Sequence, residues 1–196
     1  WMINANAGLI VIFVVFVSWL VSKLRRVTAI FIGIAIASVG LIAAGFTMNG
    51  WFVLMGIAMF SVGEMLASPK MNEYLGVIAP PGEKALYMGY ANIPLAVGWG
   101  YGSLMGGKIY DQMGDKANLA IRYMQENLNI SEEISRNEAF KTLMEVTGKT
   151  ALEATDILWN TYHPYELWYQ FAFIGMLSAV GIFIYSLVMK KYEGNI

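Results

Sequence analysis

One acidic residue lies deep inside an apolar run, where a charged group is costly. Glu64 stands near the middle of the stretch from Gly50 to about Ala79, and a carboxylate at the centre of a membrane-spanning helix costs roughly 2.5–3.5 kcal/mol on insertion scales. Ser68 follows four residues later, so both side chains project from one helical face. Such a carboxylate normally faces a cavity or a partner and attracts an ammonium group strongly. We therefore interpret Glu64 and Ser68 as solute-binding groups; a structural carboxyl bonded to a neighbouring helix is the alternative.

Two prolines predict breaks in the helices that carry polar groups. Pro69 directly follows Ser68 and removes one backbone donor, which predicts a kink and a freed carbonyl near residue 65. Pro94 predicts a second break close to the polar side chain of Asn92. Broken helices of this kind line the substrate sites of transporters.

A charged pair follows the first of these prolines. Lys70 and Glu73 are spaced i,i+3, so their side chains can meet on one face of a helix. The spacing predicts an ion pair towards the end of the helix, and a gating or proton-relay pair is the alternative.

Glycines repeat every four residues in the apolar run that contains Pro94. Gly98, Gly102 and Gly106 predict a helix-packing face, because small residues let helices approach closely in membranes. Trp99 adds aromatic surface to this run, and together with Asn92 it is a further candidate for lining a substrate cavity. Asn6, ahead of the first apolar run, is either an interfacial cap or a polar group that lines the same cavity.

The composition is typical of a membrane protein. Apolar residues make up 57% and charged residues 14% of the 196-residue chain, against roughly 45–50% and about 25% in soluble domains. Thirteen basic and fourteen acidic residues leave a net charge of −1, so no strong field favours nucleic acid. Cysteine is absent, His163 is the single histidine, and no phosphate loop or hydrolase motif occurs. We therefore expect no enzyme activity, metal site, cofactor or nucleic-acid partner.

The apolar residues are gathered into blocks about as long as a bilayer-spanning helix, which needs roughly 20 residues. They predict an all-α, multi-pass transmembrane bundle of five spans with a helical insert outside the membrane. Residues 1–107 hold the first four spans, residues 108–164 the insert, and residues 165–196 the last span and a cytoplasmic tail. The predicted spans are approximately Ala7–Val21, Val27–Met48, Gly50–Ala79, Ala85–Gly107 and Leu167–Met189.

Basic residues near the span ends predict the orientation in the cell membrane. They follow the first, third and fifth spans, whereas the turn at 47–50 carries no charge. Because the basic side is cytoplasmic, the amino end lies outside and the carboxyl end inside. Trp1, in place of an initiating Met, further predicts that the chain was cut from a longer polypeptide. The basic residues used are Lys23, Arg25, Arg26, Lys84, Lys190 and Lys191.

The acidic segment from Lys108 to Glu166 predicts short amphipathic helices packed on the outer rim of the bundle, with a lid or a docking surface as the alternative. Ser135–Glu138 and Thr150–Glu153 have capping-box spacing, Gly148 is a C-terminal stop, and Asp115–Leu128 is a third candidate helix. The predicted apolar residues are Leu119, Tyr123 and Met124 in the helix at 115–128, Ala139, Leu143 and Val146 in the helix after Ser135–Glu138, and Leu152, Ile157 and Leu158 in the helix after Thr150–Glu153.

Several of these motifs together resemble a known transporter family. The stretch Gly63-Glu64-Met-Leu-Ala-Ser68-Pro69, then Ile78-Ala79-Pro80 and Tyr87-Met88-Gly89, is similar to the tenth and eleventh helices of proton-coupled oligopeptide transporters, which belong to the major facilitator superfamily. Asn6-Ala-Gly-Leu-Ile-Val-Ile resembles the eighth helix, and Lys23-Leu-Arg25-Arg26 resembles the basic turn after it. On this resemblance the chain covers helices eight to twelve.

The resemblance implies a secondary transporter that moves di- and tripeptides or peptide-like solutes with protons by alternating access. It implies that Glu64 receives the amino group of the substrate, and that Asn6 and Ser68 line the same cavity. The proton would be the coupling ion. The partners would be membrane lipid, the peptide or small-molecule substrate and the amino-terminal helix bundle of the same transporter. Ala91 and Trp99 stand where the family commonly has Trp and Asn.

Two alternatives remain open from the sequence. The same fold could carry another small solute, which competition by dipeptides would distinguish. A non-transporting membrane scaffold, whose outer insert binds a partner, would lack further spans in the upstream gene sequence.

Overall fold

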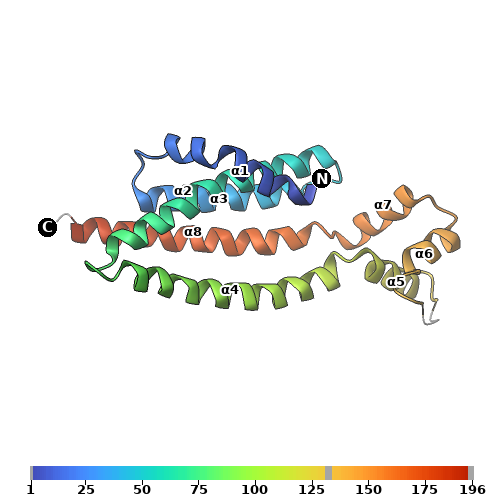
Figure 1. The fold of residues 1–196 in the computed structure, drawn as a ribbon. Helices are drawn as coiled ribbons and strands as arrows, with labels where there is room; N and C mark the ends of the chain where they lie inside the picture. The colour runs from blue at the N-terminus through green and yellow to red at the C-terminus, as the bar shows by residue number, and fades with distance from the viewer. Residues whose placement is uncertain (1, 131–133, 194–196) are drawn as a thin grey trace. The chain divides into compact units, whose positions relative to one another are not determined.

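Eight helices and no strand form the regular structure of the described part of the chain (Figure 1), which confirms the predicted all-α class. The computed structural model describes the backbone of residues 2–130 and 134–193 and the side chains of residues 4–130 and 134–190. Trp1, the side chain of Lys191 and residues 194–196 of the predicted tail lie outside these ranges. The helices are α1 (Met2–Leu20), α2 (Arg26–Gly45), α3 (Gly50–Ile78), α4 (Lys84–Met113), α5 (Lys116–Asn127), α6 (Ala139–Thr147), α7 (Ala151–Tyr162) and α8 (Glu166–Glu193).

Three helices, α2, α3 and α8, are long and apolar enough to cross a membrane. Helix α1 is apolar but shorter over Asn4–Leu20, and it begins at Met2 rather than near Ala7. Helix α4 has 30 residues and ends at Met113 rather than Gly107. It is not among the candidate spans, because glycine, tyrosine and tryptophan dilute its apolar residues. Length and composition thus support three of the five predicted spans.

The chain divides into two compact units, residues 1–96 with 168–196 and residues 97–167. In the first unit, α3 packs against both α1 and α2. Glycines let α2 and α3 lie backbone to backbone: a Cβ added to Gly33 would lie 2.6 Å from the carbonyl oxygen of Gly63, and one added to Gly63 would lie 2.6 Å from the backbone nitrogen of Ala37. Real side chains do not approach so closely, so these positions require glycine.

The same contact continues along both helices. A Cβ on Gly40 would lie 2.7 Å from the backbone nitrogen of Phe60, and one on Gly56 would lie 2.5 Å from that of Ala44. We call Gly33, Gly40, Gly56 and Gly63 the α2–α3 seam. The glycines of the seam lie seven residues apart in each helix, so they fall on one helical face, and small residues there let membrane helices approach closely. The packing face predicted from the sequence was that of Gly98, Gly102 and Gly106 in α4.

Helix α8 contacts α2 and α3 in the same unit. Its Gly175 faces the buried Ser38 of α2, whose hydroxyl a Cβ on that glycine would strike. The rings of Phe31 and Phe183 lie 5.5 Å apart between centroids, and the hydroxyl groups of Tyr74 and Tyr185 are hydrogen-bonded. Small and aromatic residues therefore hold α8 to the unit.

The second unit has a hydrophobic core of its own, built by α5, α6 and α7. Of the nine predicted apolar residues, five lie in this core and Tyr123 packs against it. The partly buried Ile157 lies outside the core, and so do Val146 and Leu152, which are 51% and 70% exposed. Val146 and Leu152 lie in the last and the first turn of α6 and α7, beside the loop that joins these helices. The buried core residues are Leu119, Ala120, Met124, Ala139, Leu143, Ala154 and Leu158.

The helix caps agree with the sequence at two of three positions. The capping box of Thr150 and Glu153 is present at α7, and Gly148 ends α6 with a φ of 64°. The box predicted for Ser135 and Glu138 is wrong. Glu138 donates its backbone N–H to the Ser135 carbonyl in a turn, so α6 begins only at Ala139 and has no side-chain cap.

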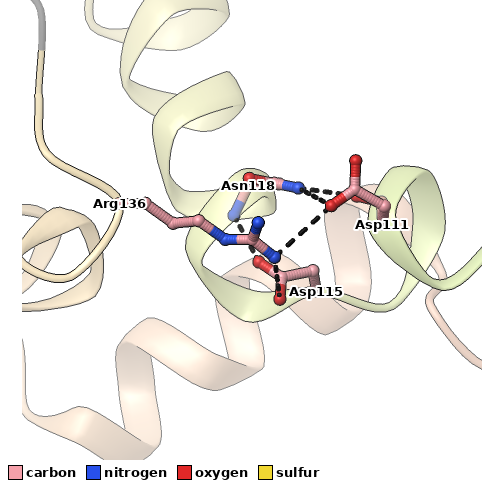
Figure 2. A network of polar contacts seen from close by, with 4 residues as sticks. All are labelled: Asp111, Asp115, Asn118 and Arg136. Atoms are coloured by element: carbon pink, nitrogen blue, oxygen red, sulfur yellow. Dashed lines mark hydrogen bonds and ion pairs between the residues drawn. The ribbon is translucent and has the colours of Figure 1, made fainter. Parts of the chain in front are cut away.

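A polar network holds the segment before α6 against the start of α5 (Figure 2). Arg136 pairs with Asp115 at 2.9 Å and with Asp111 at 3.3 Å, and the Asn118 side chain donates to Asp111 at 2.8 Å. Asp115 is also the N-cap of α5, accepting from the backbone N–H of Asn118. Partial burial opposes ionisation of Asp115, but that backbone N–H and the Arg136 guanidinium outweigh it and lower its pKa.

We expect Arg136→Ala to weaken the second unit by about 1 kcal/mol, because Asp115 is only 15% exposed and loses a charged partner. Because the pKa of Asp115 is lower in the folded than in the unfolded state, its charged form stabilises the folded unit at pH values above the unfolded pKa. This stabilisation is lost as the pH falls through the folded pKa. Amide hydrogen exchange of α5 at neutral and at acidic pH measures both effects. Lys141→Ala, which removes an exposed pair with Glu145, is the control; an equal effect there would contradict a special role for Arg136.

Candidate functional site

Glu64 is the central residue of α3, with fourteen residues on either side between Gly50 and Ile78. At 1.5 Å of rise per residue, it lies about 21 Å from each end of the helix. The hydrocarbon core of a bilayer is about 30 Å thick, so a membrane crossed by α3 would place Glu64 near its midplane. Its side chain is half-buried, which leaves the carboxylate partly accessible.

Asn6 of α1 lies beside this carboxylate. Its Nδ2 donates to Glu64 Oε2 at 3.3 Å, and its Oδ1 accepts from the Ser61 hydroxyl at 2.7 Å. Ser61 is completely buried one turn before Glu64. We call Asn6, Ser61 and Glu64 the α1–α3 polar cluster. The structure thus joins two residues that the sequence assigned to one cavity, and it adds Ser61. The sequence interpretation did not include Ser61, although its i,i+3 spacing from Glu64 places both side chains near one helical face.

The described partner of the Glu64 carboxylate is the neutral amide of Asn6. Within residues 4–130 and 134–190, no ion pair joins Glu64 to a lysine, arginine or histidine. A charge at this depth is screened poorly, and one amide hydrogen bond does not neutralise it. The cluster is therefore suited to bind a cationic group of a solute.

The other predicted site residues of α3 lie apart from the cluster. Ser68 is exposed. Although it was predicted beside Glu64 on one helical face, none of the described hydrogen bonds joins it to Asn6 or Glu64. Helix α3 continues through Pro69 to Ile78, so the proline does not end the helix. One missing backbone donor leaves the hydrogen bonds of the flanking turns in place.

A second polar cluster lies further along α3. Lys70 and Glu73 pair at 2.8 Å, which confirms the ion pair predicted from their spacing, and Arg26 of α2 pairs with the same carboxylate at 2.8 Å. The buried Lys70 also donates to the Ser22 carbonyl at 3.4 Å. Glu73 thus links two cations from two helices, and Lys70 extends the link to the turn that follows α1.

The predicted site residues of α4 are exposed. The Asn92 amide donates to the Met88 carbonyl of its own helix at 3.2 Å, and Trp99 is 75% exposed. Helix α4 runs through Pro94 without ending. A Cβ on Gly98 or Gly102 would meet nothing within 4 Å, and Gly106 is partly buried. Their role in helix packing stays a prediction.

Part of the chain is similar in sequence to a known multidrug resistance protein. Over 73 residues the chain is 34% identical to the multidrug resistance protein MdtH of Aeromonas salmonicida (strain A449), a match that covers 37% of this chain and 18% of that protein. The chain therefore matches less than a fifth of the length of this relative. No protein-family profile and no solved structure matches the chain. With its three apolar helices, the chain is similar in part to MdtH and has the architecture of a helical membrane protein.

Proposed function

We propose that this chain is part of a secondary transporter of the major facilitator type, and that the α1–α3 polar cluster holds the cationic group of its solute. The observation that carries the proposal is the Glu64 carboxylate at the centre of α3 without a cationic partner among the described residues. Intramembrane carboxylates are costly and normally mark a substrate or ion pathway. An ammonium group would supply the missing countercharge.

Two classes of cargo fit this cluster. The resemblance to oligopeptide transporters supports di- or tripeptides, whose amino group would meet Glu64, moved together with protons. The similarity to a multidrug resistance protein favours another small solute instead, and the carboxylate would select a cationic one. Both cargoes carry a positively charged nitrogen, which is the feature that the cluster recognises in this proposal.

Transport by the full-length gene product in proteoliposomes tests the function. We expect uptake of either a labelled dipeptide or a lipophilic quaternary ammonium compound, and we expect an imposed proton gradient to change its rate. Peptide uptake driven by an inward proton gradient supports symport, whereas exchange of the lipophilic cation against protons supports the second cargo. A transport rate that does not change with the gradient would contradict proton coupling. Absence of transport of both probes would contradict the proposal as a whole.

A further inference from the structure

The Ser61 hydroxyl has two hydrogen-bond acceptors within reach but can donate to one of them at a time. Its hydroxyl oxygen lies 2.7 Å from Asn6 Oδ1 and 2.8 Å from the Ile57 carbonyl oxygen, but a hydroxyl group has a single proton. The Ile57 carbonyl lies one helical turn earlier and already accepts the backbone N–H of Ser61 in the regular helical pattern. We therefore infer that the Ser61 hydroxyl donates its proton to Asn6 Oδ1.

This hydrogen bond sets the orientation of the Asn6 amide. With Oδ1 held by Ser61, Nδ2 faces Glu64 and donates to its carboxylate. The reverse orientation would place Oδ1 against a carboxylate oxygen, and two acceptors repel unless the carboxyl group carries a proton. Ser61 thus favours the amide orientation that matches a charged Glu64.

Charged groups from neighbouring helices do not replace this effect. Helix α1 contains no ionisable side chain, and Arg26 of α2 pairs with Glu73, nine residues beyond Glu64. Lys70 pairs with the same Glu73. Tyr185 of α8 is hydrogen-bonded to Tyr74, ten residues beyond Glu64. Among the described hydrogen bonds and ion pairs, the polar contact of the Glu64 side chain is therefore with Asn6.

We propose that Ser61 is a positioning residue that gives the site its preference for cationic over neutral solutes. This inference rests on the proposed function. Ser61 acts through Asn6: it turns the amide N–H groups towards the Glu64 carboxylate and holds the amide oxygen away from it. Without the hydroxyl, the amide is free to turn, and its oxygen can face the carboxylate in place of the N–H groups.

Matched pairs of probes measure this preference in the full-length protein. We use a dipeptide with its N-acetyl derivative, and a lipophilic quaternary ammonium with its uncharged carbon isostere. Ser61→Ala is expected to lower the preference for the cation roughly two- to tenfold, the value of one neutral hydrogen bond. Ser61→Cys, which keeps a weak donor, is expected to fall between Ser61→Ala and the wild type.

Ser38 offers a matched control on α2. It is buried like Ser61, and its hydroxyl donates to the Ile34 carbonyl at the same 2.8 Å, but among the described hydrogen bonds it has no side-chain partner. Ser38→Ala is expected to leave the preference unchanged. Because Ser61 acts through Asn6, the effect of Ser61→Ala should vanish in an Asn6→Leu background, whereas a merely structural role would give additive losses.

The outcomes separate this inference from the function on which it rests. Equal effects of Ser61→Ala and Ser38→Ala, or a Ser61 effect that persists without Asn6, would overturn the inference. If Glu64→Gln abolishes the preference in that same experiment, the proposed function survives. A wild-type protein that binds cation and isostere equally, with Glu64→Gln unchanged, would overturn both.

Discussion

Replacing Glu64 with glutamine is expected to lower the affinity of the full-length protein for an ammonium-bearing solute roughly 10- to 150-fold. This is the value of one charge-assisted contact, roughly 1.5–3 kcal/mol. Glutamine keeps the size of the side chain and its hydrogen bond with Asn6, but it removes the charge. Folding and membrane insertion should remain intact, because the substitution removes a charge that is costly in the membrane. Solute binding and thermal unfolding of the purified variant measure the two effects.

Glu73 provides the matched control on the same helix. Its carboxylate already pairs with Arg26 and Lys70, and Lys70 is 7% exposed. Glu73→Gln leaves a buried cation without its partner, so it should cost stability rather than solute affinity. The reverse pattern, with Glu64→Gln lowering the unfolding temperature and leaving binding unchanged, would make Glu64 a structural contact and remove the proposed site.

The second large effect is expected at the α2–α3 seam. Gly63→Leu should destabilise the packing of α2 on α3 by at least about 3 kcal/mol, the upper end of the usual cost of overpacking. The reason is that the added Cβ meets backbone atoms of Gly33 and Ala37, which cannot rotate away as a side chain would. Unfolding in detergent, or the yield of folded protein after membrane insertion, reports the loss.

Gly76 lies on the same helix and supplies the control, because a Cβ placed there would meet nothing within 4 Å. Gly76→Leu should therefore be tolerated. Similar losses for the two leucine variants would show that α3 tolerates no large residue at either place, and the seam would not explain the effect at Gly63.

Much of the local structure of this protein follows from short-range pattern. The apolar runs predict where long helices form, the spacing of Thr150 and Glu153 predicts the cap of α7, and the depth of Glu64 follows from its position within one run. Each of these features depends on residues within a few turns of one another, where side-chain geometry is set by helical periodicity. The capping box predicted for Ser135 and Glu138 was wrong, because these residues form a hydrogen-bonded turn instead.

The tertiary structure alone decides which distant groups meet. Asn6 and Ser61 lie 55 residues apart in the chain, and Asn6 and Glu64 lie 58 apart, so no local periodicity brings them together. The sequence also contains glycine repeats in several helices, but backbone approach selects those of α2 and α3 for the seam. The chain by itself therefore determined an apolar helical protein with a carboxylate at the centre of one helix. Packing decided the partners of that carboxylate, because hydrogen bonds and close helix contacts depend on how helices dock rather than on the spacing within any of them.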